Sequence, residues 1–157
     1  MLKKERYKLK ETVKGSTQKR DKLEQEQYSI EPEVDQASCK VENPFYKLLI
    51  NGKSPYDKFL RDCQGSVPKF NNQKEELNAL ILLIAQGLDY PLDRVDELSG
   101  REDKYREFEF KIGRTRVYYF SHPDIGNIII NGHCNKRTEK TDQGKYIERF
   151  RTLKKEY

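Results

Sequence analysis

The charged residues of this chain separate by sign into three stretches that its net charge of +5 conceals. Residues 106–157 carry 12 Lys and Arg against 7 Asp and Glu, and residues 1–28 carry 9 against 5. Residues 29–105 are acidic, with 10 basic and 14 acidic side chains. Lys and Arg bind phosphate, so a basic stretch within a well-patterned fold favours a nucleic-acid partner. The alternative is an ordinary solvated basic surface.

The cysteines and histidines argue against metal and disulfide chemistry. Cys39, Cys63 and Cys134 are odd in number, far apart and form no CxxC pair, so we expect neither a disulfide framework nor a structural zinc site. His122 and His133 are too few for a His-rich metal centre. No apolar run approaches the roughly 20 residues that a bilayer span needs. We therefore expect a soluble, cytoplasmic chain with no metal, no cofactor and no membrane partner.

The elements that must position the basic residues follow from the spacing of apolar residues. Phe108, Phe110 and Ile112 alternate with charged residues and predict a half-buried strand, and the pair Gly113-Arg114 predicts a tight hairpin. The expected elements are a strand over 45–50, a helix from 54 to about 63, a long helix from 72 to 87, a turn or short helix over 93–98, strands over 105–112, 115–120 and 127–133, and a helix from 142.

This order predicts an α+β fold, with a small antiparallel sheet made of a three-stranded meander and one N-terminal strand. We expect the helices on one face of the sheet and the other face open. In the last helix, Tyr146, Phe150, Leu153 and Tyr157 form an apolar stripe at helical spacing. That stripe should be buried, which leaves Lys145, Arg149 and Lys154 largely in solvent.

Residues 1–40 have a different character from the rest of the chain. They hold 11 apolar residues, against 43 in residues 41–157, and these follow no strict helical period. Such a segment buries too little surface to fold alone. We expect a charged extension over 1–40, either a mobile arm or a helix through about Gln27, and a folded domain over 41–157.

The C-terminal third resembles a known family. The segments REFEFKIGRTRVYYF and IIINGHCNKRTEKTDQGKYIERFRTLKKEY are similar to the second half of the RelE/HigB superfamily of bacterial type II toxins, most like the HigB branch. That branch has a Tyr/Trp-Arg-Val strand, an aliphatic strand, and a Lys-Lys-Thr-x-Lys-Thr loop before a helix. The resemblance covers Tyr105–Tyr157, extends in layout back to Phe45, and implies a RelE-like fold.

The resemblance also implies an activity. Most toxins of this family are metal-independent endoribonucleases that cleave mRNA on the ribosome, and a cognate antitoxin, here expected to be of the helix-turn-helix type, silences them. Attack of an RNA 2′-hydroxyl on the adjacent phosphate builds negative charge on the phosphorane oxygens. Positioned Lys and Arg donors stabilise that charge more than they stabilise the ground state.

The resemblance assigns these roles to particular residues. The implied catalytic residues are Lys111, Arg116, Lys136 and Arg137, and the implied RNA-binding residues are Arg114, Tyr118, Asn135 and Lys140. Arg116 matches the arginine of the Arg-Val strand, and residues 135–141 match the loop before the last helix. A register shift of two residues would place Glu109 at the position of Lys111, where it would be a general base or an ion-pair partner of its basic neighbours.

Structural roles for the same residues remain open at this point. Arg116 could form a cross-strand ion pair with Glu107 or Glu109, and the loop cations could be solvated charges. His133 is better suited to packing than to proton donation, and Tyr118 could pack rather than stack on a base. Two rival functions also remain: inhibition of DNA gyrase, as by ParE toxins of the same fold, and a catalytically inactive nucleic-acid-binding module.

Overall fold

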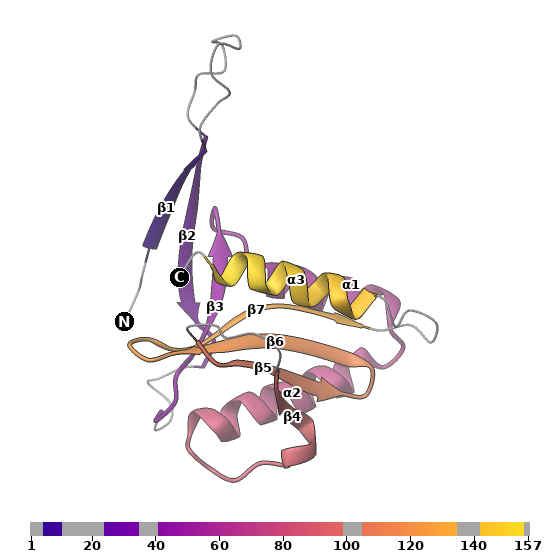
Figure 1. The fold of residues 1–157 in the computed structure, drawn as a ribbon. Helices are drawn as coiled ribbons and strands as arrows, with labels where there is room; N and C mark the ends of the chain where they lie inside the picture. Colours follow the sequence, from indigo (N-terminus) through magenta and orange to yellow (C-terminus); the bar gives the residue numbers. More distant parts are fainter. Residues whose placement is uncertain (1–4, 11–23, 35–40, 99–104, 135–141, 156–157) are drawn as a thin grey trace.

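A seven-stranded mixed sheet forms the centre of the molecule in the computed structural model, which describes residues 5–10, 24–34, 41–98, 105–134 and 142–155 (Figure 1). The strands are β1 (Glu5–Lys10), β2 (Glu24–Pro32), β3 (Phe45–Ile50), β4 (Val95–Glu97), β5 (Glu107–Ile112), β6 (Thr115–His122) and β7 (Gly126–Cys134). Their order across the sheet is β1-β2-β3-β7-β6-β5-β4. β3 and β7 run parallel, whereas the other neighbours are antiparallel. The α+β class is confirmed, but the sheet is larger than expected.

The helices are α1 (Pro55–Ser66), α2 (Phe70–Ala85) and α3 (Asp142–Lys154), and a short 3-10 turn, η2 (Leu92–Arg94), precedes β4. The predicted start of α1 is confirmed, because the Ser54 hydroxyl accepts a hydrogen bond of 3.0 Å from the Asp57 amide. α2 begins at Phe70, earlier than the predicted cap at Asn72, and Lys69 precedes it in a left-handed conformation. No helix in these described ranges is long and apolar enough to cross a bilayer.

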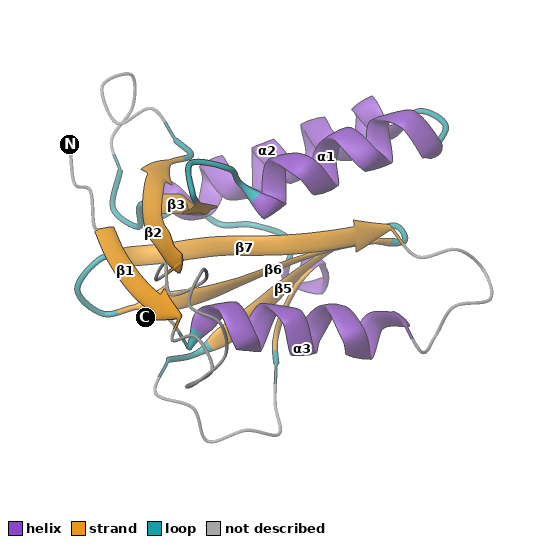
Figure 2. Cartoon of the chain, turned by 90° about the horizontal axis from the view of Figure 1, so that it is seen from above, coloured by secondary structure: helices purple, strands orange, loops and turns teal. Residues whose placement is uncertain are grey.

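Helices cover both faces of the sheet, which corrects the expectation of one open face. Figure 2 shows α1 and α2 on one side and α3 on the other. Residues of α1 and α2 pack with Phe45, Phe110, Val117 and Ile129, and Phe150 and Leu153 of α3 pack in a separate cluster. Neighbouring residues of β7 point to opposite faces, so Ile128 and Ile130 join the α3 cluster while Ile129 joins the other.

The N-terminal region enters the sheet well before residue 41. β2 pairs with β3, opposing Tyr28 to Ile50 and Ile30 to Leu48, and both Tyr28 and Ile30 are buried in the α3 cluster. The expected helix through Gln27 is therefore wrong, since residues 24–32 are a strand. Polar Glu and Gln residues hide this strand from a local pattern search, and its partners β1 and β3 supply the pairing that stabilises it.

α3 also differs from the expected amphipathic helix. Phe150 and Leu153 are buried as predicted, but Tyr146 is 39% exposed, and Tyr157 lies outside the described residues. Lys145 and Arg149 are exposed. Lys154 was expected in solvent and is instead buried, because its ammonium lies 2.7 Å from the Glu107 carboxylate and 3.1 Å from the Tyr105 carbonyl oxygen. A buried partner on β5 thus overrides the helical pattern.

Candidate functional site

Three side chains of the meander stand in one row across the sheet. Lys111 of β5 lies directly opposite Arg116 of β6, and Arg116 lies directly opposite His133 of β7. Directly opposed residues share a face, with Cβ atoms about 4.5–5.5 Å apart. His133 stacks on Tyr146 of α3, with ring centroids 4.3 Å apart, so the row lies on the α3 face. We call Lys111, Arg116 and His133 the basic row.

Arg116 turns towards the β5–β6 hairpin. Its Nη1 donates to the Gly113 carbonyl oxygen at 2.7 Å and to the Thr115 carbonyl oxygen at 3.0 Å. Arg114 is exposed on the same turn. The strand register does not favour the alternative of a cross-strand ion pair, because Arg116 opposes Lys111 and the Glu107 carboxylate binds Arg151 and Lys154.

Lys111 and Glu109 occupy different positions relative to this row. Lys111 is half-buried, and its ammonium lies 2.6 Å from the Asp96 carboxylate on the neighbouring strand β4. Glu109 lies on β5 two residues before Lys111, where it is buried and opposite Tyr118. The register therefore places Lys111, not Glu109, beside Arg116.

Tyr118 belongs to the core, so the expectation that it stacks on an RNA base is wrong. It is fully buried, its hydroxyl oxygen lies 2.7 Å from Nε2 of His133, and its ring packs on His133 and Phe150. α3 covers this side of β6, which the strand alternation alone does not reveal. His133 is buried in turn between Tyr118 and Tyr146, as its expected packing role requires.

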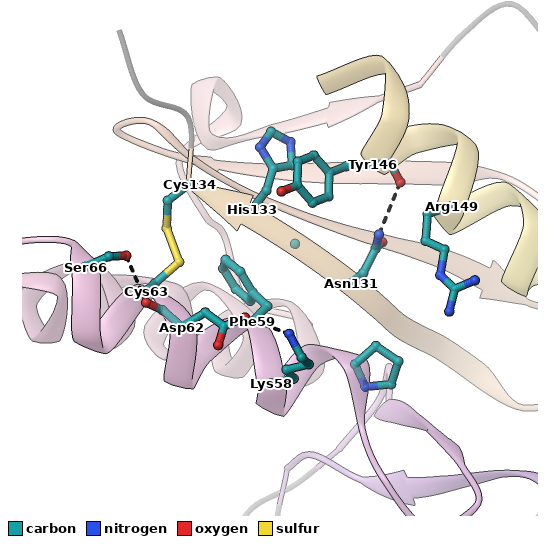
Figure 3. Close-up of a pocket in the computed structure, with 12 residues that line it drawn as sticks. Lys58, Phe59, Asp62, Cys63, Ser66, Asn131, His133, Cys134, Tyr146 and Arg149 are labelled. Carbon is teal, nitrogen blue, oxygen red and sulfur yellow. Dashed lines mark hydrogen bonds and ion pairs between the residues drawn. A yellow bond between two sulfur atoms is a disulfide. The ribbon is translucent and has the colours of Figure 1, made fainter. Parts of the chain in front are cut away.

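A cavity of about 410 Å³ opens beside the end of β7 (Figure 3). β3 pairs with β7 only at residues 127–129, so in the described part of the chain no strand lies beside this edge of residues 130–134. α1 and α3 flank the edge from opposite faces. The polar lining includes Lys58 and Asp62 of α1, Asn131 of β7, and Tyr146 and Arg149 of α3. No sequence pattern indicated this cavity, because three elements that are distant in sequence build it.

A disulfide between Cys63 and Cys134 borders the cavity and joins α1 to the end of β7 (Figure 3). The expectation of no disulfide is wrong for this pair. The two residues are 71 positions apart, and only the packing of α1 on β7 brings them together. Gly132 permits that packing, since a Cβ there would lie 2.6 Å from the Arg116 carbonyl oxygen and 2.9 Å from the Phe59 ring. Cys39 lies outside the described residues.

Four of the sequence-predicted residues, Asn135, Lys136, Arg137 and Lys140, also lie outside the described residues. Their segment joins the end of β7 to the start of α3, and Figure 2 shows both of these ends on the same side of the molecule. The basic row and the cavity border that end of β7 as well. The structure thus groups the described candidates Lys111, Arg114 and Arg116 near the points where this segment leaves and returns.

Comparison with known proteins identifies no relative: no family model matches the chain, and no match is found among the curated proteins or among the solved structures. Within the described ranges, no three His, Cys, Asp or Glu side chains form a group that could hold a metal ion. The candidate site therefore rests on its own geometry.

Proposed function

We propose that this chain is a toxin of a type II toxin-antitoxin system, a RelE/HigB-like endoribonuclease that cleaves mRNA on the ribosome without a metal. One observation carries the proposal: two cations of the C-terminal third, Lys111 and Arg116, are cross-strand neighbours on one face. Arg116 in turn lies opposite His133, which is two residues before the sequence 135–141 that holds Lys136, Arg137 and Lys140. The α+β architecture supports a RelE-like fold in its order of strand, two helices, meander and final helix.

Arg116 is the best-placed phosphate ligand of the described residues. Among the described residues, both hydrogen bonds of the Arg116 side chain use its Nη1 atom. Its Nε and Nη2 atoms can therefore donate to two oxygens of one phosphate. Because arginine stays charged and keeps a fixed planar geometry, it suits a phosphorane whose charge grows during attack by the 2′-hydroxyl. Lys111 must exchange its ion pair with Asp96 for the phosphate, and its contribution is therefore smaller.

The test is primer extension on mRNA after induced expression, together with cleavage in a purified translation system. Arg116→Ala should slow cleavage by roughly 10²–10³-fold, and Lys111→Ala by less. Arg61→Ala, an exposed cation on α1, is the matched control and should cleave like the parent. If Arg116→Ala remains as toxic as the parent, the site assignment fails.

The same assays decide between the proposed function and its rivals. Intact mRNA together with loss of gyrase supercoiling would indicate a ParE-like inhibitor, and RNA binding without cleavage would indicate an inactive module. Cleavage should be measured with and without a thiol reductant, because a cytoplasmic enzyme works where the Cys63 and Cys134 thiols are kept reduced. The proposal also includes a helix-turn-helix antitoxin, which a small neighbouring reading frame would encode.

A further inference from the structure

We infer that the Cys63–Cys134 disulfide is a redox switch, which a low-molecular-weight thiol opens by attacking the Cys134 sulfur from the cavity beside β7. The bond joins α1 to the end of β7, and both cysteines line the cavity (Figure 3). A cavity of about 410 Å³ is large enough for a small thiol. This thiol chemistry is independent of the proposed ribonuclease activity.

The two cysteines differ in their access to solvent. Cys63 is 4% exposed and belongs to the apolar cluster that α1 and α2 form with the sheet. Cys134 is only half-buried at the end of β7. In thiol–disulfide exchange a thiolate must reach a disulfide sulfur, so the more accessible sulfur is attacked more readily. We therefore expect attack at Cys134, with Cys63 as the leaving group.

The exchange takes two steps. A thiolate forms a bond to the Cys134 sulfur, the bond between Cys134 and Cys63 breaks, and its electron pair leaves with the Cys63 sulfur, which takes a proton from water. A second thiolate attacks the sulfur of the bound thiol and releases Cys134, which is protonated in turn. The protein disulfide thus gains two electrons and two protons, and two small thiols are oxidised to one small disulfide. That small disulfide is the oxidant of the reverse reaction.

The contacts around the two sulfurs accommodate the reduced pair as well as the oxidised one. Thr115 Oγ1 lies 3.5 Å from the Cys134 sulfur and donates its own hydrogen bond to the side-chain oxygen of Gln73. The Thr115 oxygen can therefore accept a hydrogen bond from a free Cys134 thiol. Cys63 has apolar neighbours, among which a free thiol packs as a small apolar side chain.

α1 has contacts with the sheet that do not depend on the disulfide. Tyr56 and Phe59 are buried in the cluster between the helices and the sheet, and the Phe59 ring packs against Gly132. Opening the bond should therefore loosen the last turn of α1 and the end of β7 while the core stays folded. Cys134 immediately precedes residues 135–141, so the redox state decides whether the residue before that segment is covalently anchored to α1.

The first experiment measures how the thiol reaches the bond. The oxidised full-length chain, with Cys39→Ser so that two cysteines remain, is treated with 2-mercaptoethanol, quenched with acid, alkylated and analysed by mass spectrometry. The rate should rise linearly with thiol concentration and stay constant at low urea concentrations, because the thiol attacks the folded protein. A rate that increases steeply with urea would show that unfolding exposes the bond and would overturn the inference.

A matched pair of variants tests entry through the cavity. Ser66→Trp adds a large side chain to the cavity lining and should slow reduction about tenfold by limiting access. Gln64→Trp places the same ring on an exposed position of α1 that does not line this cavity, and it should react like the parent. Equal rates for the two variants would overturn the cavity as the route of entry.

The second experiment identifies the attacked sulfur with glutathione disulfide as the probe. In the chain with Cys39→Ser and Cys63→Ser, Cys134 should form a mixed disulfide with glutathione. It should do so at least about tenfold faster than Cys63 in the chain with Cys39→Ser and Cys134→Ser, because Cys63 is buried. Peptide mass mapping measures both rates. An equal or faster reaction at Cys63 would overturn the assignment of Cys134.

Hydrogen exchange separates a switch from a purely structural crosslink. In the Cys39→Ser chain, reduction should speed amide exchange about tenfold in the last turn of α1 and in residues 130–134. The far-UV circular dichroism and the exchange of β5 should stay unchanged. Loss of the helical signal, or faster exchange throughout the sheet, would show that the bond is needed for folding and would overturn the switch. Identical exchange of the two redox forms would overturn it as well.

Discussion

The two faces of the sheet are built from different parts of the chain. The face under α1 and α2 is closed by elements that follow β3 directly, within residues 45–85. The α3 face needs both ends of the described chain, because Tyr28 of β2 and Phe150 of α3 belong to the same cluster. The helices that cover one face are therefore neighbours in sequence, whereas the elements that cover the other face come from opposite ends of the described chain.

The two faces also differ in polarity. Aromatic and aliphatic residues dominate the α1–α2 cluster. The α3 face, by contrast, buries several polar or charged side chains, namely Glu107, Glu109, Asn131, His133 and Lys154. Buried polar groups are costly and persist where other interactions compensate them. The contrast indicates that one face mainly supplies stability and that the other holds the candidate site.

The largest effect is expected from removing the N-terminal part of the α3 face. Deletion of residues 1–40 removes the buried Tyr28 and Ile30, and large-to-small changes at one such site alone cost about 2–5 kcal/mol. The truncated chain should fail to fold in urea unfolding followed by circular dichroism. Deletion of residues 1–23 keeps β2 and should therefore destabilise the fold less than deletion of residues 1–40. A 1–40 deletion with an unchanged midpoint would show that the α3 face forms without β2.

The next largest effect tests the buried charges of the α3 face. Glu107 is 4% exposed and binds both Arg151 at 3.0 Å and Lys154 at 2.7 Å. Glu107→Ala should lower the free energy of unfolding by about 3–5 kcal/mol, since it leaves buried cations without an anion. Lys154→Met keeps the Arg151 pair and should cost less, as measured by chemical denaturation. Equal costs would show that the lysine, not the carboxylate, organises this cluster.

A smaller effect is expected where α1 approaches β7. Gly132→Ala places a Cβ against backbone and the Phe59 ring and should cost about 1–3 kcal/mol by overpacking. Gly144→Ala in α3 meets nothing within 4 Å and should instead stabilise by about 0.5–1 kcal/mol. Thermal unfolding of both variants checks the pair. If Gly132→Ala unfolds at the same temperature as the parent, the packing of α1 on β7 is looser than described.

The smallest effect is expected at Glu33, an acidic residue at the edge of the face that α1 and α2 cover. Burial raises the pKa of the Glu33 carboxyl, and the nearby Lys47 lowers it by less. Its protonated form is thus favoured in the folded state, so the associated stability is present below pH 4.5 and is lost as pH rises through the folded pKa. Relative to Glu33→Gln, the parent should gain stability as pH falls from 7 towards 4.5 in matched thermal melts. A constant difference between the two would contradict the raised pKa.

Local patterns predicted much of the meander and part of the site. The tight turn at Gly113-Arg114 opposes Ile112 to Thr115, and this register places Lys111 opposite Arg116. The position of His133 opposite Arg116 was not predictable in the same way. It depends on a longer turn before β7 and on a register shift between Tyr118 and Tyr119, and neither has a distinct sequence pattern.

Long-range packing accounts for what sequence patterns missed. The burial of Lys154 depends on Glu107, 47 residues away in sequence, and the covering of Tyr118 depends on Phe150 of α3. The strand β2 and the cavity also depend on elements that are distant in sequence. Hydrophobic periodicity describes which side of an element is apolar, but not which distant element will cover it. The functional roles of Lys111, Arg114 and Arg116, and of Asn135, Lys136, Arg137 and Lys140, stay predictions for the assays above.

The disulfide between Cys63 and Cys134 turns the middle of the chain into a covalent ring that contains α2, β5 and β6. A protease that cuts once between these cysteines opens the ring but releases no fragment. The nicked protein should run as one species on a non-reducing gel and as two bands after reduction. A single cut outside the ring should release a fragment under both conditions, so the gel pattern alone locates the cut.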